Sequence, residues 1–598
     1  MLLVLFEVIF SLFVVKEGNL LVIILTSLAI SAFFSLVLSF FSKKIQNKLN
    51  YIFIIILLII FLVHTFYYTI FDDILSLNTI LNNIKAIAFY EVLIDRIIRY
   101  WYLILIYIIL AIINILLIHK NVMNLKKNKN YYIAMILFIL SGILVFNINK
   151  NTDNILIKSV RNNGLLMTIC KDIKNTFFNN DSKIIYNENN EKYLVSEYNI
   201  LNTKFPKTKN EEINEISSYL KNSIPSNKNE YTGIFKDKNL IIILAESFSD
   251  IAIDKELTPT LYKLYNDSIR FNNYYAPTFR IGTADAEYML DNSLYPVDIE
   301  TALVESNNNH LIYNYANVFK DIGYKTYAYH NYDYDFYERD KFFENLKYNY
   351  LACGNGLEEK INCSLKTPSD YEMMKNTVND YINDEKFMTY YVTMSGHFNY
   401  SSNHTIVEKN YNLVKELPYS EKVKYYLATQ IELDKGIEAL IKKLTDNNKL
   451  DDTVIMLVGD HYPHGLTLDE FNEKSSYKRD KMFGKVKMPL IIYNPEVKNI
   501  STDKYFSMID ILPTILNLYG ISFDSRLLIG RDVFSENETP VIFYNRSFIT
   551  NKGTYNALLE KVEGTLTKDD IKTVKDDMYN KFRASRLILE NDYYSLIK

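Results

Sequence analysis

Polar residues that could act together follow four separate apolar runs of this sequence. The runs and their following residues are Asn239–Ala245 with Glu246, 324–329 with His330, 388–395 with His397, and Thr453–Gly459 with Asp460 and His461. Continuous apolar or aromatic runs of this length are typical of parallel strands buried on both faces. Because ligands bind outside the carboxyl ends of such strands, we expect these side chains to converge at one sheet edge. Two carboxylates and three imidazoles there would suit a metal-assisted reaction.

Each of these residues also has a simpler interpretation. Glu246 could be a solvated loop acid or lie near a helix N-terminus, and Asp460 could begin a turn while His461 packs beside the sheet. Adjacent carboxylate and imidazole groups at a strand end are nevertheless a common arrangement of metal ligands. His464 could support such a site from nearby, but we expect it to be exposed.

A possible nucleophile lies in a separate segment, residues 280–287, with the sequence Arg-Ile-Gly-Thr-Ala-Asp-Ala-Glu. Gly282 permits a tight turn or a close approach of a ligand. Thr283 is placed to begin a helix, so its hydroxyl would lie in the positive field of the helix N-terminus. If a metal ion also bound this hydroxyl, its pKa would fall and it could act as a nucleophile. The simpler alternative is a threonine that only caps the helix.

Further residues could hold a substrate that contains phosphate. Arg339 can bind a phosphate through two parallel hydrogen bonds, and Tyr337 could line a sugar or glycerol pocket. His330 lies in the same segment, and His397 could hydrogen-bond a phosphate oxygen or help to transfer protons. The alternatives are a surface arginine and histidines that are satisfied within the core.

The composition of the 598-residue chain separates an intensely apolar first quarter from a mixed remainder. The formal net charge of −4 gives no indication of nucleic-acid binding. The sequence has 3 cysteines, and their spacing does not resemble a zinc ribbon. Cys353 and Cys363 could form a disulfide if their domain is extracellular, or they could be two free buried thiols.

Apolar runs in the first quarter predict a membrane domain over residues 1–147. The runs lie near residues 2–15, 20–41, 51–70, 101–118 and 131–146. A membrane-spanning helix needs about 20 apolar residues, so the first and last runs are short and the first is the least certain. We predict about five transmembrane helices. We predict no cleaved signal peptide, because no basic region precedes Leu2 and further apolar runs follow.

The distribution of lysines predicts the orientation of these helices. Lysines follow the second and fourth runs: Lys43, Lys44, Lys48, Lys120, Lys126, Lys127 and Lys129. Because cytoplasmic loops carry an excess of Lys and Arg, we expect both loops and the N-terminus inside, and everything after about residue 147 outside. Charged residues between the third and fourth runs would then lie outside, at the surface or on an interfacial helix: Asp72, Asp73, Asp95, Arg96 and Arg99.

The remainder of the chain predicts a linker followed by an α/β domain. Residues 148–236 are rich in Asn and Lys and low in core residues, so we predict an extracellular linker or stalk with a helix around residues 210–222. From residue 237 to 598, strands alternate with helical patterns, which predicts a mostly parallel central sheet flanked by helices. Helices are also expected at residues 507–518 and 567–590.

Taken together, these segments resemble the lipoteichoic acid synthase family, within the alkaline phosphatase/sulfatase superfamily. The resemblance covers nearly the whole chain and is carried by residues 244–248, 282–287, 395–398 and 458–462, and by His330 with Arg339. It implies a multi-pass membrane domain and an extracellular sulfatase-like catalytic domain. Residues 258–264, 509–518 and 530–532 fit the wider superfamily.

The resemblance also implies roles for individual residues. One divalent cation, expected to be Mn²⁺ with Mg²⁺ or Zn²⁺ as alternatives, would be bound by Glu246, Thr283, Asp460 and His461. Thr283 would also be the catalytic nucleophile. The glycerol phosphate substrate would be bound by His330, Tyr337, Arg339 and His397. The chain departs from the family pattern at Ala284, at Tyr337 and at residues 462–465.

The activity implied is transfer of glycerol phosphate from phosphatidylglycerol to a polyglycerol-phosphate or glycolipid acceptor, on the outer face of the cell membrane. The resemblance implies no nucleic-acid partner, and it leaves the oligomeric state open. One alternative is a related phosphoethanolamine transferase, phosphodiesterase or sulfatase of the cell envelope. The other is an envelope binding or regulatory protein without catalytic activity.

Overall fold

The computed structural model of the chain forms two compact units, Met1–Ser182 and Lys183–Lys598. The residues that it describes are 2–71, 73–77, 80, 90–120, 132–133, 135–137, 139–140, 155–178, 183–186, 188–189, 191–279, 282–296 and 302–597. The boundary between the units falls inside the linker predicted at residues 148–236. The residues of this linker are therefore divided between the two units.

The first unit contains three described helices that are long and apolar enough to cross a membrane. They are α2 (Leu20–Leu38), α3 (Lys43–Phe71) and α5 (Tyr90–His119). The first apolar run forms α1 (Leu2–Ile9) and the π-helical η1 (Phe10–Val15), which together are shorter than a span. The run predicted at residues 131–146 falls largely outside the described residues, as do Asp72, Lys126, Lys127 and Lys129.

Aromatic side chains form the centre of the first unit. Phe6 packs edge-on against Phe61 and Tyr107, with ring centroids 5.3 Å and 4.9 Å away. All three side chains are fully buried. Such edge-to-face pairs are favourable beyond the area that they bury, so they hold α1, α3 and α5 together.

Two further helices, α7 (Leu156–Asn163) and α8 (Leu165–Phe178), belong to the first unit. The Glu7 carboxylate accepts hydrogen bonds from the N–H groups of Leu165 (2.7 Å) and Leu166 (2.8 Å). It thereby satisfies donors that a helix N-terminus leaves without an intrahelical partner. The Thr26 hydroxyl donates to the Asn163 carbonyl at 2.7 Å, which joins α7 to α2.

The second unit is built on a six-stranded sheet in the order β4-β3-β5-β1-β6-β7. The strands are β1 (Asn239–Ala245), β3 (Lys325–Asp333), β4 (Asn349–Cys353), β5 (Phe387–Val392), β6 (Thr453–Gly459) and β7 (Leu490–Tyr493). All neighbouring pairs are parallel except β6 with β7. Every residue of β1, β5, β6 and β7 is buried. This confirms the predicted mostly parallel sheet made from apolar runs.

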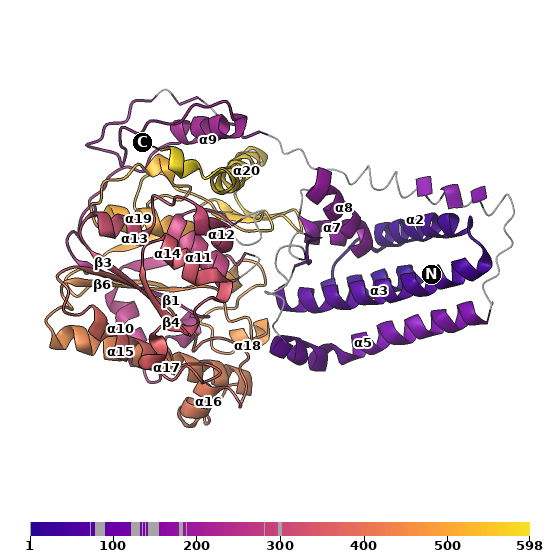
Figure 1. Cartoon of the computed structure of the whole chain (residues 1–598), viewed down its shortest axis with the longest axis horizontal. Coiled ribbons are helices and arrows are strands. Elements are labelled where there is room, and N and C mark those ends of the chain that lie inside the picture. The colour runs from indigo at the N-terminus through magenta and orange to yellow at the C-terminus, as the bar shows by residue number, and fades with distance from the viewer. Residues whose placement is uncertain are drawn as a thin grey trace. The chain divides into compact units, whose positions relative to one another are not determined.

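Helices cover this sheet on both faces, as Figure 1 shows. One group contains α11 (Thr283–Asn292), α13 (Tyr315–Asp321), α14 (Arg339–Asn345) and α19 (Ile511–Leu518). The other group contains α10 (Pro259–Asp267), α15 (Asp370–Thr377) and α17 (Glu421–Asp446). Because both faces of the sheet are buried, the central strands are nearly continuous apolar runs and do not alternate apolar with polar residues.

The remaining elements surround this core. Strand β2 (Arg270–Tyr275) pairs in parallel with β8 (Ser501–Ser507), and a small antiparallel sheet contains β9 (Val541–Ile542), β10 (Phe548–Thr550), β11 (Gly553–Asn556) and β12 (Lys561–Gly564). The helices predicted at residues 210–222 and 567–590 are confirmed as α9 (Glu211–Asn222) and α20 (Lys568–Glu590). Arg583 joins these two helices by an ion pair with Glu215 at 2.7 Å.

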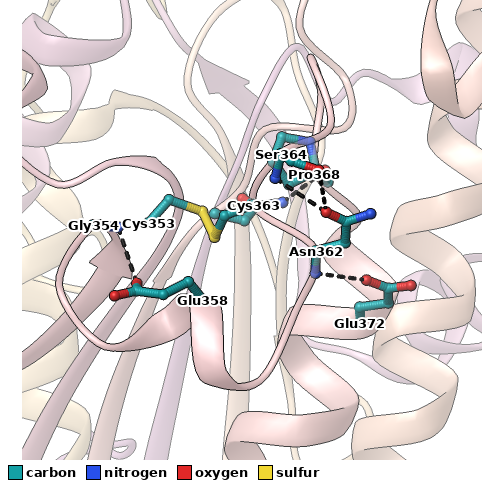
Figure 2. The surroundings of a disulfide bond; sticks show 9 residues. Cys353, Gly354, Glu358, Asn362, Cys363, Ser364, Pro368 and Glu372 are labelled. Atoms are coloured by element: carbon teal, nitrogen blue, oxygen red, sulfur yellow. Dashed lines mark hydrogen bonds between the residues drawn. A yellow bond between two sulfur atoms is a disulfide. The ribbon is translucent and has the colours of Figure 1, made fainter.

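Cys353 and Cys363 form a disulfide with a Cα–Cα distance of 5.6 Å, so the alternative of two free thiols is wrong (Figure 2). The bond connects the end of the edge strand β4 to the loop that leads toward α15. Cys170, in α8, is a free and exposed cysteine.

Close packing at Gly459 gives a test of the sheet's geometry. A Cβ atom at Gly459 would lie 2.3 Å from the Phe248 carbonyl oxygen, whereas a Cβ atom at Gly323 would meet no atom within 4 Å. We expect Gly459→Ala to destabilise the protein by about 3 kcal/mol, because backbone atoms must move. Gly323→Ala is the control, and it should cost about 1 kcal/mol because Gly323 has a φ of +92°. Urea denaturation of the detergent-solubilised protein measures both, and equal losses would contradict the packing described.

Candidate metal and nucleophile site

The ends of two adjacent strands bring three candidate metal ligands together. Strands β1 and β6 pair in register up to Ala245 with Gly459, so Glu246 and Asp460 follow at neighbouring positions. One ligand atom each from Glu246, Asp460 and His461 lies within 4.8 Å of the others. All three side chains are buried. The convergence expected from the strand ends is therefore present at these residues.

Short hydrogen bonds orient the two carboxylates. Asp460 Oδ1 accepts the N–H groups of Ser247 (2.8 Å) and His461 (2.7 Å). The Ser247 hydroxyl donates to Glu246 Oε1 at 2.8 Å. These donors bind Asp460 Oδ1 and Glu246 Oε1. The other two oxygens, Asp460 Oδ2 and Glu246 Oε2, face the Thr283 hydroxyl. Sequence reasoning missed Ser247, whose φ of 56° lets its backbone and side chain serve both acids.

His461 presents a nitrogen lone pair to the two acids. Its Nδ1 donates to the Tyr462 carbonyl at 2.9 Å, so Nε2 carries no proton when the ring is neutral. Nε2 lies 3.2 Å from Asp460 Oδ2 and 3.6 Å from Glu246 Oε1. A histidine that ligates a metal is usually oriented in this way, with its other nitrogen donating to a carbonyl or carboxylate.

Burial and like charge shape the electrostatics of this centre. Burial, with a further contribution from Glu246, raises the pKa of Asp460 to about 7. Burial alone would lower the pKa of His461, but the charges of Asp460 and Glu246 outweigh it and raise this pKa. The buried acids thus favour any positive charge that can reach them.

Thr283 lies beside these ligands at the start of α11. Its hydroxyl donates to Asp460 Oδ2 at 2.7 Å and lies 3.3 Å from Glu246 Oε2 and 3.4 Å from His461 Nε2. Thr283 is the first helical residue, and the preceding Gly282 occupies the cap position, so the alternative of a simple N-cap threonine is wrong. Gly282 has a φ of +53°, and a Cβ there would lie 3.2 Å from the His461 ring.

These donors fit one divalent cation. Carboxylate oxygens, an imidazole nitrogen and a hydroxyl oxygen suit Mn²⁺, Mg²⁺ or Zn²⁺. Two buried carboxylates that share one hydroxyl donor leave negative charge that a cation would compensate. Glu246, Thr283, Asp460 and His461 are therefore the residues that could hold it.

A second group of side chains surrounds Arg339, the first residue of α14. Arg339 is only 2% exposed, so the alternative of a surface arginine is wrong. Its Nε donates to Glu287 at 2.9 Å, and its guanidinium lies 5.4 Å from the centre of the Tyr337 ring. Sequence reasoning missed the role of Glu287. Its position four residues after Thr283, on the same face of one helix, was the available signal.

His330, near the end of β3, orients Arg339. His330 Nδ1 donates to the Val392 carbonyl at 3.1 Å, which leaves Nε2 as an acceptor 3.4 Å from Arg339 Nη1. Burial, and then the charge of Arg339, lower the pKa of His330 well below its usual value. His330 is therefore neutral, and its accepting nitrogen faces the arginine.

Tyr337 and His397 complete the residues expected to bind substrate. Tyr337 and the next residue, Glu338, both have left-handed backbone conformations, with φ of 59° and 54°. Two such residues in succession are strained, and such strain is often found at binding sites. Burial raises the pKa of Tyr337, and the Arg339 guanidinium lies 5.4 Å from the centre of its ring. His397 stacks on Phe398, with ring centroids 4.9 Å apart.

His464 differs from the expectation that it is exposed. It is half-buried, because its ring packs against those of His461 and Tyr462, each with a centroid distance of 4.2 Å. His464 is therefore a neighbour of the proposed metal ligand rather than a surface residue.

The chain is similar to several known proteins. Residues 238–521 match the sulfatase family. Lipoteichoic acid synthase 2 of Bacillus subtilis (strain 168) is 27% identical over 371 residues, which are 57% of this chain and 54% of that protein. Lipoteichoic acid synthase of Staphylococcus aureus (strain USA300) is 28% identical over 369 residues, 58% of this chain and 55% of that protein. The matches thus span about half the length of these relatives.

A solved structure shows the same fold. The crystal structure of the lipoteichoic acid synthase LtaP from Listeria monocytogenes has a TM-score of 0.50 and 24% identity. The similarity covers 61% of this chain and 94% of that chain. The second unit is therefore a sulfatase-like α/β domain.

The charge balance of the site gives a test by cation removal. In protein stripped of divalent cations at about pH 8, we expect Asp460→Asn to raise the melting temperature, because it removes one of two buried like charges. Added Mn²⁺ should stabilise the wild type by several degrees and the variant much less. No Mn²⁺-dependent shift in the wild type would contradict the assigned ligands.

The pH dependence follows from the same groups. The folded-state pKa values of Asp460 and His461 are both raised, so protonation of each favours the folded state. The chelated wild type should therefore lose stability as the pH rises from about 5 to about 8, and Asp460→Asn should lose less. Thermal unfolding at a series of pH values measures this difference.

Proposed function

We propose that this chain, which carries a sulfatase-family domain of the alkaline phosphatase/sulfatase superfamily, transfers glycerol phosphate from phosphatidylglycerol to a polyglycerol-phosphate or glycolipid acceptor. The observation that carries the proposal is the Thr283 hydroxyl, which donates a hydrogen bond to the buried Asp460 at 2.7 Å. The buried Arg339 pairs with Glu287, which lies one turn after Thr283 on the same helix. A nucleophile beside acidic ligands, with a buried guanidinium nearby, suits attack on a phosphate diester. The similarity to lipoteichoic acid synthases supports this substrate class.

The first half of the reaction is attack by Thr283. A divalent cation held by Glu246, Thr283, Asp460 and His461 would lower the pKa of the hydroxyl and offset charge on phosphate oxygens. Asp460, which already accepts the hydroxyl hydrogen bond, is placed to take the proton. The threonine oxygen then bonds to phosphorus, and the bond from phosphorus to the diacylglycerol oxygen breaks. Diacylglycerol leaves with a proton, and glycerol phosphate remains as an ester of Thr283.

The second half returns the enzyme to its starting state. An acceptor hydroxyl attacks the same phosphorus, and the bond to the Thr283 oxygen breaks, so the hydroxyl is restored. Arg339 stabilises the phosphate oxygens in both halves, since its charge is fixed and its position is set by Glu287 and His330. We assign to His397 the contact with substrate and the transfer of protons at the acceptor.

The proposed lipid substrate suits a chain that has membrane-spanning helices. The chain is a membrane protein, as three apolar helices among its described residues and its similarity to lipoteichoic acid synthases indicate, and we propose that the second unit is extracellular. The Cys353–Cys363 disulfide supports that orientation, because disulfides persist in oxidising compartments. The lysine distribution that places the N-terminus inside agrees with it.

Substitution of Thr283 tests the nucleophile. We expect Thr283→Ala to abolish release of diacylglycerol from fluorescent phosphatidylglycerol in the presence of Mn²⁺, because no hydroxyl remains to attack. Thr283→Ser keeps the hydroxyl and should retain measurable turnover. Normal turnover by Thr283→Ala would show that Thr283 is not the nucleophile.

The same assay separates the main alternative. The sulfatase family match also admits a phosphoethanolamine transferase, a phosphodiesterase or a sulfatase. Lipid extracts in which phosphatidylethanolamine, rather than phosphatidylglycerol, is consumed would favour the first of these enzymes. Release of diacylglycerol from phosphatidylglycerol favours the transfer of glycerol phosphate.

A further inference from the structure

The segment that carries Tyr337 and Arg339 rests on the end of β4. The Tyr334 N–H donates to the Cys353 carbonyl at 3.0 Å, and the Tyr350 hydroxyl donates to the Tyr334 carbonyl at 3.2 Å. Gly354 packs so closely on the Tyr334 ring that a Cβ atom there would lie 2.9 Å from it. The position of residues 334–339 therefore depends on where β4 ends.

Support from β4 matters because this segment is strained. Tyr337 and Glu338 hold left-handed conformations, which cost free energy and persist only where surrounding contacts impose them. On the far side, Glu338 accepts a hydrogen bond from the Asn307 side chain at 3.0 Å. Without support at Tyr334, the segment can relax and displace the Tyr337 ring and the Arg339 guanidinium.

The strand ends that carry the two histidines rest on a different segment, residues 368–370. Asp370 is fully buried, and its Oδ1 accepts the backbone N–H groups of Met394 (2.9 Å) and Ser395 (3.1 Å). The same oxygen accepts the Asn331 side-chain amide at 2.8 Å, and the Pro368 carbonyl accepts it at 3.0 Å. Asn331 follows His330, and Ser395 precedes His397 by two residues. This segment therefore positions both histidines.

The disulfide connects these two supports. Cys353 ends β4, and Cys363 lies ten residues later, before the turn that leads to Pro368 (Figure 2). The turn is ordered locally, since the Ser364 N–H and hydroxyl both donate to Asn362 Oδ1, at 3.1 Å and 2.6 Å. Next to Cys363, the Asn362 N–H donates to Glu372 of α15 at 3.4 Å, as Figure 2 shows.

We propose that the Cys353–Cys363 disulfide is a positioning crosslink for the substrate pocket. It fixes the Tyr337 and Arg339 side of the pocket relative to the His330 and His397 side. The proposal rests on the proposed function, because it concerns the pocket for the glycerol phosphate group. A purely stabilising disulfide would act by restricting the unfolded chain and would leave ligand affinity in the folded protein unchanged.

The metal ligands provide an internal control. Glu246 and Asp460 follow β1 and β6, and β4 is separated from β1 by β3 and β5 in the sheet. The hydrogen bonds that orient the Glu246 and Asp460 carboxylates are donated by Ser247 and His461. These bonds do not involve residues of the disulfide loop. Loss of the crosslink should therefore weaken binding of glycerol phosphate without changing the affinity for Mn²⁺.

The experiment is calorimetric titration of the full-length protein in detergent with Mn²⁺ and with sn-glycerol 1-phosphate. The variants are the double substitution Cys353→Ser with Cys363→Ser, and Cys170→Ser as the matched control, since Cys170 is a free thiol in the other unit. We expect the double variant to bind sn-glycerol 1-phosphate about tenfold more weakly, with unchanged Mn²⁺ affinity. The control should match the wild type for both ligands.

A reversible treatment covers the case in which the double variant folds poorly. A water-soluble phosphine reduces the disulfide to two thiols with two electrons and two protons, while the phosphine takes oxygen from water and becomes its oxide. The affinity of the wild type for sn-glycerol 1-phosphate should fall on reduction and return on reoxidation. If reoxidation did not restore the affinity for sn-glycerol 1-phosphate, the loss would reflect unfolding. That result would contradict a positioning role of the disulfide.

The outcomes separate the two proposals. A wild type that binds Mn²⁺ but no sn-glycerol 1-phosphate would contradict the proposed function. A wild type that binds this ligand with the same affinity before and after verified reduction would overturn the crosslink proposal and leave the proposed function standing.

Discussion

Two carboxylates buried at the ends of adjacent parallel strands impose the main constraint on this molecule. The in-register pairing of β1 with β6 places Glu246 and Asp460 side by side, where water cannot screen their repulsion. The surrounding groups meet this constraint: backbone N–H donors hold Asp460, the Ser247 hydroxyl binds Glu246, and the two acids favour the protonated form of His461, whose Nε2 lies 3.2 Å from Asp460. The arrangement is compatible with binding one cation. Without a cation, the two buried like charges destabilise the folded protein.

The part of the site around Arg339 carries a buried positive charge instead. Arg339 is buried, paired with Glu287 and aligned by the neutral His330, so its position is fixed before any substrate binds. An anion that reaches Arg339 would therefore meet a preorganised positive charge, and in the proposed reaction such a charge would lower the barrier to phosphoryl transfer. Helix α11 links the two halves, because Thr283 begins it and Glu287 lies one turn later.

Strand ends were predictable from sequence because the buried runs are continuous and ligands collect at one edge of a parallel sheet. Thus Glu246, Asp460, His461 and the position of Thr283 followed from local pattern. The pairing of Arg339 with Glu287, and the tautomer of His330 set by Val392, depend on contacts between distant segments. No periodicity encodes such contacts. The Cys353–Cys363 bond was left open for the same reason, since spacing alone does not place two sulfur atoms together.

A glycerol phosphate ester on Thr283 would be detected by mass spectrometry. The full-length protein would be incubated with phosphatidylglycerol and Mn²⁺ without an acceptor, then digested and its peptides sequenced. We expect a glycerol-phosphate adduct on the peptide that contains Thr283, localised to that residue and absent from Thr283→Ala. Diacylglycerol release from phosphatidylglycerol without any adduct on Thr283, or with the adduct on another residue, would contradict it.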